Sequence, residues 1–358
     1  MKILFLIPYP LQEAPSQRFR FEQYLPLLSN NSHSFEVQSF LTGENWKVFY
    51  SKGRALQKCL ILLIGFLKRI NTLFILRKFD LIFIHRETTP IGPPIFEWII
   101  AKIFQKKIIY DFDDSIWLTD KTNESRLEKL LRWRNKVGSI CKWSTKVSCG
   151  NSYLSEYARG FNKNVVLNPT TIDTEKLHDP EGTPVKRRDD NITIGWTGSH
   201  STLKYLHLLE PVLLKLETTF AHVRFLVIAD RNPELSLQRV DFLKWSRETE
   251  ADDLRQMDIG VMPLPDDEWA KGKCGFKALQ YMSMEIPCVV SSVGVNTTIV
   301  EHGVTGFLAK TEADWQDCIT SLIENKLLRK QIGKAGRKKV IDHYSVLSNQ
   351  RNFLSLFE

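Results

Sequence analysis

The segment that most constrains the fold runs from residue 257 to residue 306. It opens with the short apolar run DIGVMP, which ends at Pro263, and reaches a second apolar run, CVVS, at residues 288–291. Short apolar runs with β-branched residues are typical of parallel strands that are buried on both faces. Apolar residues from Phe276 to Met282 recur at helical spacing between the two runs. The segment therefore predicts a strand, a loop, a helix and a second strand.

The loop before this predicted helix combines glycines with lysines. Gly272, Lys273 and Gly275 lie in the loop, and Lys277 lies just inside the helix. The first turn of a helix offers unbonded backbone N–H groups and the positive end of the helix dipole, and two lysines add charge there. A loop of this kind after a parallel strand is typical of a site for a nucleotide diphosphate.

Strand-like runs alternate with helix-like segments along the whole chain, which predicts an α/β fold with doubly wound parallel sheets. The runs lie at residues 3–7, 81–84, 107–110, 165–167, 192–196, 223–228, 259–262 and 288–290. A length of 358 residues favours two domains. The best boundary is the segment 168–188, which is rich in turn formers and charged residues. We therefore expect domains at residues 1–170 and 171–340, followed by a helix at 341–358 that crosses back onto the first domain.

The charge of the chain is uneven, since residues 1–170 carry 25 Lys and Arg against 14 Asp and Glu, and the remainder carries 24 against 27. The first half is expected to meet something anionic. It has no nucleic-acid recognition motif and no basic residues interleaved with stacking aromatics, so nucleic acid is not the expected partner. Six cysteines without a CxxC pair indicate a reducing cytoplasm and argue against metal ligation by cysteine. The start of the chain predicts a first strand and no signal peptide.

The segment 257–306 resembles the retaining nucleotide-sugar glycosyltransferases of family 4, which have the GT-B fold of two Rossmann-like domains facing a cleft. That family has an acidic loop with proline, a Glu-x7-Glu helix, a strand of the type Pro-Val-Val-Ala-Ser followed by glycine, and then Gly-x-x-Gly-hydrophobic. The matching positions here are Pro287, Val289, Ser291, Gly294, Glu301, Gly303, Gly306 and Phe307. The two glutamate positions depart from the pattern and hold Gly272 and Gln280. The resemblance implies transfer of a sugar from a nucleotide-sugar to a hydroxyl, without metal or organic cofactor.

The resemblance also implies a donor site in the second half. In the family, a Gly-Arg pair and a lysine five residues later bind the pyrophosphate; Gly198, Ser199 and Lys204 occupy these positions, so Lys273 or Lys277 is expected to replace the arginine. Read without the resemblance, residues 196–205 are a helix capped by Ser199 or Ser201 with an exposed lysine. The remaining donor assignments complete the site. Leu243 and Lys244 would read the base, Gln280 would hold the ribose, and Glu268, Asp266 or a backbone amide near Gly272 and Gly275 would contact the sugar.

Candidates on the acceptor side lie in the first half. Asp80 and His85 match a family segment whose histidine lies near the acceptor, although a lone histidine after a strand is also a common structural residue. Asp111, Asp113 and Asp114 follow the strand at 107–110 and are candidates for acceptor recognition, for catalysis, for helix capping or for metal binding. If the strand continues, Asp111 and Asp113 share a face. Arg18 and Arg20 suggest a charged acceptor such as a lipid-linked phosphate, or are solvated arginines.

Residues 51–78 contain seven basic residues and no acidic ones. One apolar helix face is predicted there, at Leu60, Leu63, Ile64, Leu67, Ile70 and Leu73. The helix either packs this face on the sheet or lies on anionic lipid. The longest apolar stretch, residues 59–67, is shorter than the roughly 20 residues that span a bilayer.

Together these features predict a GT-B glycosyltransferase with a UDP- or GDP-linked donor and a glycan or lipid-linked acceptor, acting in cell-surface polysaccharide synthesis. Its catalytic residues would be His85, Asp113 and Lys204. We expect a cytoplasmic protein that can be peripheral at the inner face of the membrane. The alternatives are another GT-B enzyme, such as a sugar-nucleotide epimerase, and a non-catalytic partner that only binds the nucleotide-sugar.

Overall fold

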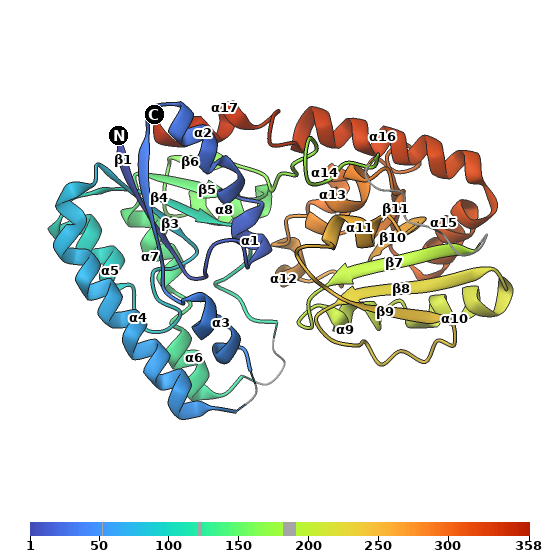
Figure 1. Ribbon diagram of the computed structural model, residues 1–358, viewed down its shortest axis with the longest axis horizontal. Helices are drawn as coiled ribbons and strands as arrows, with labels where there is room; N and C mark the ends of the chain where they lie inside the picture. Colours follow the sequence, from blue (N-terminus) through green and yellow to red (C-terminus); the bar gives the residue numbers. More distant parts are fainter. Residues whose placement is uncertain (52, 121–123, 182–190) are drawn as a thin grey trace. The chain divides into compact units, whose positions relative to one another are not determined.

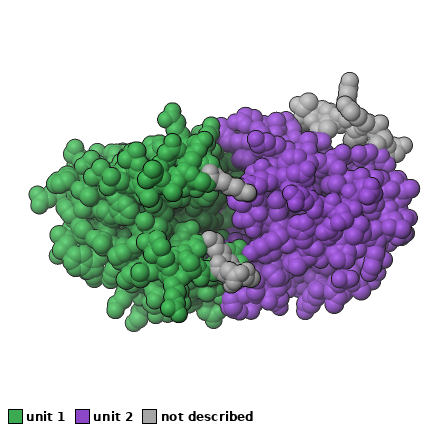
Figure 2. Space-filling view, turned by 90° about the horizontal axis from the view of Figure 1, so that it is seen from below, with its two compact units in different colours: residues 1–170, 350–358 green, residues 171–349 purple. Residues whose placement is uncertain are grey.

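A computed structural model describes residues 1–51, 53–120, 124–181 and 191–358. The chain divides into two compact units, which Figure 2 colours separately. Unit 1 contains residues 1–170 and 350–358, and unit 2 contains residues 171–349. The part of the expected linker from 182 to 188 lies outside the described residues.

Unit 1 is built on a parallel sheet of six strands in the order β2-β1-β3-β4-β5-β6 (Figure 1). The strands are β1 (Lys2–Ile7), β2 (Ser34–Ser39), β3 (Leu81–His85), β4 (Lys107–Phe112), β5 (Lys146–Cys149) and β6 (Val165–Leu167). The α-helices are α1 (Pro15–Arg18), α2 (Leu25–Asn30), α3 (Gly43–Phe49), α4 (Ala55–Ile75), α5 (Ile95–Trp98), α6 (Arg126–Arg132), α7 (Lys136–Trp143), α8 (Ser152–Arg159) and α17 (Gln350–Leu354). A π-helical turn, η3 (Ile99–Ile103), extends α5, and short 3-10 turns lie at η1 (Glu22–Tyr24), η2 (Leu76–Lys78) and η4 (Ser355–Phe357).

Unit 2 repeats this architecture with a parallel sheet in the order β12-β11-β10-β7-β8-β9. The strands are β7 (Ile192–Gly198), β8 (Val223–Ala229), β9 (Val240–Lys244), β10 (Ile259–Met262), β11 (Cys288–Ser291) and β12 (Phe307–Ala309). The helices are α9 (Leu203–Leu206), α10 (Glu210–Thr219), α11 (Glu250–Leu254), α12 (Glu268–Lys271), α13 (Phe276–Ser283), α14 (Asn296–Ile299), α15 (Glu312–Glu324) and α16 (Lys326–Tyr344). The predicted α/β fold with two parallel sheets is confirmed.

The central strands are buried on both faces, as their composition predicts. Every residue of β3, whose sequence is LIFIH, is buried, and β10 and β11 are buried throughout. Helices on both sides of each sheet remove these apolar runs from water, which is why they do not alternate with polar residues. The last strand positions then deliver their polar residues to the carboxyl edge of the sheet.

The end of the chain differs from the predicted single helix over 341–358. Residues 341–344 are the last turn of α16 in unit 2, and a separate short helix, α17, belongs to unit 1. The Phe353 ring stacks on the Tyr24 ring with centroids 4.3 Å apart, and Phe357 is buried near Phe83. Leu347 lies between the two helices and is exposed, so it does not share their apolar face.

Of the two placements predicted for helix α4, packing of its apolar face on the sheet is wrong, because that face points to solvent. Leu60, Leu63 and Leu67 are at least half exposed. The residues that pack on unit 1 are Ile61, Gly65, Arg69 and Thr72. The apolar and buried faces of this helix are therefore opposite faces.

Candidate active site

The N-terminus of α13 is held in a conformation that requires glycine. Gly275, immediately before the helix, has a φ of +69°, and a Cβ placed there would lie 2.2 Å from Ile299 Cδ1. The left-handed backbone and the close neighbour both exclude larger residues. The helix then starts at Phe276, and the N-cap residue Gly275 has no side chain with which to bond the first N–H groups.

Two lysines accompany this helix start, as predicted. Lys277 is half-buried, and its ammonium lies 5.4 Å from the centroid of the Trp196 ring; the Lys273 ammonium lies 4.7 Å from the Trp269 ring. Burial, followed by the positive charge of Lys273, lowers the pKa of Lys277 to about 8. Across the described residues, no carboxylate comes within ion-pair distance of the Lys277 ammonium. A bound anion would offset both the burial and the repulsion.

The loop after β7 is shaped by Trp196. A Cβ at Gly198 would lie 2.4 Å from the Trp196 ring, so glycine is required by packing. The predicted cap of the following helix by Ser199 or Ser201 is wrong. Helix α9 starts after Thr202, whose side chain makes no cap bond, and the hydroxyls of Ser199 and Ser201 bond to each other at 2.8 Å.

His200 fixes the same loop to the sheet. Its backbone N–H and its Nδ1 both bond to Asp230, at 2.5 and 2.6 Å, and Asp230 follows the end of β8. Lys204 lies in α9, with its ammonium 5.2 Å from the Tyr205 ring. The charge that acts on Lys277 comes from Lys273, so these two lysines are the pair that the structure brings together.

Tyr281, which the sequence did not single out, locks α13 to the sheet. Its hydroxyl accepts a hydrogen bond from the backbone N–H of Thr197 at 3.0 Å and donates one to the carbonyl of Val261 at 3.3 Å. Its ring covers Gly260, where a Cβ would lie 2.4 Å away. The sequence could not predict this role, because Gly260 and Tyr281 are 21 positions apart and the contact joins three elements of the fold.

Gln280 lies one turn into α13 and is 5% exposed. Its Nε2 lies 3.4 Å from Nε2 of the buried His178. Arg337 donates to the His178 carbonyl at 3.0 Å and to the Ser283 carbonyl, so His178 is held against the end of the same helix. Gln280 is therefore anchored by a histidine rather than fully exposed to a ligand.

The other predicted donor residues lie at different depths. Gly272 is buried, whereas Glu268 starts α12 and pairs with Lys271 at 2.7 Å on the exposed surface. Leu243 and Lys244 end β9, the edge strand next to β8, with Leu243 half-buried and Lys244 exposed.

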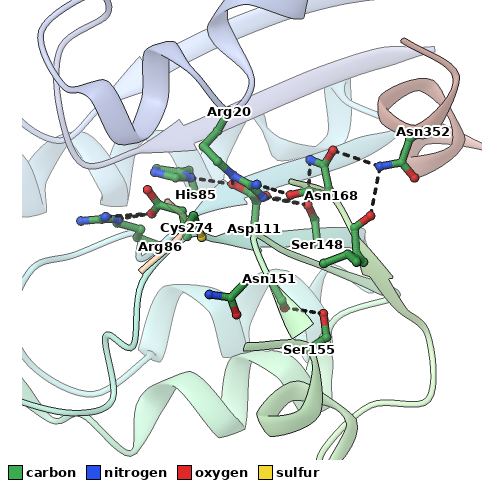
Figure 3. Close-up of polar contacts among 12 residues, drawn as sticks. Arg20, His85, Arg86, Asp111, Ser148, Asn151, Ser155, Asn168, Cys274 and Asn352 are labelled. Carbon is green, nitrogen blue, oxygen red and sulfur yellow. Dashed lines mark hydrogen bonds and ion pairs between the residues drawn. The ribbon is translucent and has the colours of Figure 1, made fainter. Parts of the chain in front are cut away.

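In unit 1, Arg20, Asp111 and His85 form a buried cluster (Figure 3). The Arg20 guanidinium pairs with Asp111 and donates to the carbonyl of Asn168, and Ser148 donates to Asp111 at 2.6 Å. Burial by itself would raise the pKa of Asp111, but the Arg20 charge and the bonds from His85 and Arg20 outweigh it and hold this pKa well below its ordinary range. Neither Arg20 nor Asp111 exposes more than 1% of its surface. The prediction that Arg20 and Asp111 contact an acceptor directly is wrong, because their charged groups are buried and paired with each other.

His85 is oriented by this cluster. Its Nδ1 lies 2.8 Å from Asp111 Oδ2, and a carboxylate can only accept, so Nδ1 carries the proton. Nε2 is buried and has no hydrogen-bond partner among the described residues. Within the described part of the protein, Nε2 is therefore an unprotonated nitrogen in a fixed position that accepts no hydrogen bond.

Asp113 and Asp114 lie beyond the end of β4 and face a different partner. Because the strand ends at Phe112, the face expected to be shared by Asp111 and Asp113 does not arise. Arg86 bonds to Asp113 at 2.8 Å and comes within 3.9 Å of Asp114. In the ranges that the structure describes, no group of three or more His, Cys, Asp or Glu side chains is placed to hold a metal. Arg18 ends α1, where its guanidinium lies 5.0 Å from the Phe19 ring.

Comparison with solved structures identifies the architecture. Sucrose-phosphate synthase from Thermosynechococcus elongatus superposes with a TM-score of 0.72 at 14% identity, covering 100% of this chain and 98% of that one. A glycosyltransferase from Rickettsia africae gives a TM-score of 0.71 at 14% identity, with 99% and 97% covered. HepE of Anabaena, solved with UDP-glucose, gives 0.64 at 16% identity, with 100% and 99% covered. The fold is GT-B, as predicted.

The second half also matches a family model. The family described as Glycosyl transferases group 1 matches residues 191–325, which contain Lys204, Lys273, Lys277 and Gln280. The prediction of a glycosyltransferase enzyme is confirmed at the level of this domain. A comparison with curated protein sequences finds no match.

Proposed function

We propose that this protein is a retaining glycosyltransferase of the family 4 type that uses a UDP- or GDP-linked sugar. The observation that carries the proposal is Lys277, a half-buried cation at the start of α13, next to Lys273 and without a carboxylate partner among the described residues. A nucleotide diphosphate supplies the missing negative charge at the helix N-terminus. HepE, which has the same fold, is solved with UDP-glucose, and this supports a nucleotide-sugar donor.

In the proposed reaction, the bond between the sugar C1 and the diphosphate oxygen breaks first. Lys273, Lys277 and the first N–H groups of α13 stabilise the negative charge that develops on the departing diphosphate. The acceptor hydroxyl attacks C1 on the same face, and its proton passes to the departing phosphate oxygen. Charge is balanced without a metal, since the lysines neutralise the leaving group.

In this proposal, Gln280 holds the ribose in place of the family's glutamate, and Lys204 adds charge at the diphosphate. An amide both accepts and donates hydrogen bonds, so it can serve ribose hydroxyls without carrying charge. In unit 1, Arg20 and Asp111 hold the His85 ring in place, and we propose that His85 acts on the acceptor side through Nε2, which is buried in the free protein. We propose a glycan or lipid-linked acceptor in cell-surface polysaccharide synthesis.

The test has a binding arm and a turnover arm. Lys277→Met should weaken the binding of UDP or GDP in titration calorimetry, whereas Lys338→Met, at an exposed lysine paired with Asp342 on α16, should bind as the parent protein does. The protein should then release free nucleotide diphosphate from one nucleotide-sugar when an acceptor is added. Nucleotide binding without any turnover would show a non-catalytic partner, and equal binding by both variants would show that the site lies elsewhere.

A further inference from the structure

Helix α4 presents a continuous apolar stripe to solvent. Its exposed large side chains are Leu56, Leu60, Leu63, Ile64, Leu67, Ile70 and Phe74. At about 100° per residue these positions fall within roughly one third of the helix circumference, and the stripe is about 27 Å long. Water is an unfavourable environment for so many adjacent hydrocarbon side chains.

The opposite face of α4 is built into unit 1. Gly65 lies against the buried ring of Phe40, where a Cβ would come within 2.3 Å of ring carbon. Arg69 is buried and donates to the carbonyls of Ile7 at 2.8 Å, Gln38 at 3.1 Å and Thr88 at 2.8 Å. These bonds fix how the helix is rotated about its axis, so the exposure of the apolar stripe is a property of the fold.

Two neighbouring elements, α5 and α6, also expose apolar side chains. The Phe66 ring lies 6.2 Å from Phe96 in α5, and the backbone of Leu131 in α6 accepts a hydrogen bond from Gly92, shortly before α5. Further exposed apolar side chains lie on these elements, at Ile95, Trp98, Ile103, Leu127, Leu130, Leu131 and Trp133. We call the exposed residues of α4, α5, η3 and α6 together the α4–α6 surface; Figure 1 labels the three α-helices. Soluble monomers rarely expose apolar patches of this extent.

The charges around the α4–α6 surface have one dominant sign. Residues 51–78 contain no Asp or Glu. Lys68 lies beside the apolar stripe, and Arg77 and Lys78 are exposed in the η2 turn that follows the helix. Helix α6 adds Arg126, Lys129 and Arg132 against one acidic residue, Glu128. Apolar side chains, tryptophans and flanking basic residues are the composition of elements that lie in the interface of an anionic bilayer.

We propose that the α4–α6 surface docks unit 1 on an anionic lipid bilayer, with α4 lying in the plane of the membrane. A second copy of this surface is a poorer partner, because docking would bring two positively charged rims together. Helix α4 with η2, residues 55–78, is long and apolar enough to cross a membrane by length and composition. Crossing would require Arg69 to leave three backbone carbonyls, whereas in-plane docking keeps all of its bonds. This inference concerns a surface distinct from the donor site and goes beyond the proposed reaction.

The experiment is flotation of the full chain with vesicles of phosphatidylcholine alone or mixed with phosphatidylglycerol. The parent protein should bind the anionic vesicles at low salt, and high salt should reduce binding to an apolar remainder. The double variant Leu63→Gln, Leu67→Gln should lose at least tenfold in apparent affinity. Its matched control, Leu208→Gln, Leu327→Gln, changes two leucines of unit 2 that are also more than half exposed, and it should bind as the parent does. Lys68→Gln and Lys129→Gln should each cost about fivefold, on anionic vesicles only.

Three results would overturn the proposal. One is no flotation with anionic vesicles at low salt, and another is an equal loss in the two leucine double variants. The third is a concentration-dependent dimer in sedimentation velocity that is absent in the Leu63→Gln, Leu67→Gln variant. That result would show that the surface binds a second copy of the chain. Nucleotide binding is measured separately and without lipid. A failure of lipid binding therefore does not contradict the proposed reaction, and a failure of nucleotide binding does not contradict the proposed docking surface.

Discussion

Replacing Lys277 by methionine should stabilise the free protein while weakening nucleotide binding. Methionine keeps an unbranched apolar side chain over the Trp196 ring but removes the charge. The pKa of Lys277 falls from 10.5 to about 8 because of burial and the nearby Lys273. At about 1.4 kcal/mol per pH unit this difference corresponds to about 3.5 kcal/mol, and solvent around a half-buried side chain reduces it to about 1–2 kcal/mol.

The sign of the pH dependence follows from the two pKa values. Below pH 8 the lysine is charged in both the folded and the unfolded protein, so the folded state carries the whole penalty. Between about 8 and 10.5 the folded protein loses the proton while the unfolded chain keeps it, and the penalty disappears. Urea unfolding should therefore show Lys277→Met to be more stable than the parent at neutral pH, with the difference vanishing as the pH approaches 10.5.

Binding should change in the opposite direction. A diphosphate needs the charged lysine, so the variant should lose roughly ten- to a hundredfold in affinity for UDP or GDP, the range for hydrogen bonds to charged groups. The parent protein should bind more weakly above pH 8 and take up a proton on binding, which calorimetry in buffers of different ionisation enthalpy detects. If Lys277→Met is less stable than the parent and binds nucleotide equally well, Lys277 is a packing residue and the reasoning fails.

Three further outcomes can be measured. Gln280→Ala should weaken binding of the nucleotide-sugar, whereas Gln280→Glu should be tolerated because a carboxylate can still accept bonds from the ribose hydroxyls. Equal losses in calorimetry would make Gln280 a packing residue, held through its Nε2 contact with His178. Asp111→Asn should cost about 3–5 kcal/mol in urea unfolding at neutral pH, because it leaves buried Arg20 without its counter-charge. The pKa of Asp111 lies below its ordinary 3.8, so the stabilisation by the Arg20–Asp111 pair is present above pH 3.8 and is lost in the parent protein as the pH falls below that value. An unchanged free energy of unfolding in Asp111→Asn would show that the pair is neutral for stability. Gly65→Ala should cost about 1–3 kcal/mol in thermal unfolding because it strikes the Phe40 ring, whereas Gly43→Ala, which meets nothing within 4 Å, should not; similar melting of the two variants would contradict the packing of α4.

Of the eight strands that the sequence predicts, seven are interior strands and one, β6, lies at the edge of its sheet. The strands that it leaves out are edge strands or short. β2 has the sequence SFEVQS, pairs only with β1 and is partly exposed, so it has no continuous apolar run. β5 has only four residues, KVSC, and its burial comes from its neighbours β4 and β6. Both strands are defined by pairing with distant segments, which a local pattern does not contain.

The candidate site divides in the same way. Lys273, Gly275 and Lys277 are close together in sequence, so the loop and the helix start could be predicted from spacing alone. Arg20 and Asp111 are 91 positions apart, and two charged residues near strand ends are equally consistent with solvent exposure. Only the fold shows that they neutralise each other. For the same reason the apolar face of α4 could be predicted, but not the direction in which it points, since Arg69 sets that through three distant carbonyls.

Unit 1 is discontinuous along the chain, and this has a consequence for the order of events during synthesis. Phe353 and Phe357 complete its aromatic core beside Tyr24 and Phe83, yet a ribosome reaches them only after making the whole of unit 2. The sheet of unit 2 can close as soon as its own residues have emerged. The first unit to be translated is therefore the last to bury all of its core. Until residues 350–358 are synthesised, the aromatic side chains that Phe353 and Phe357 cover stay exposed in the nascent chain.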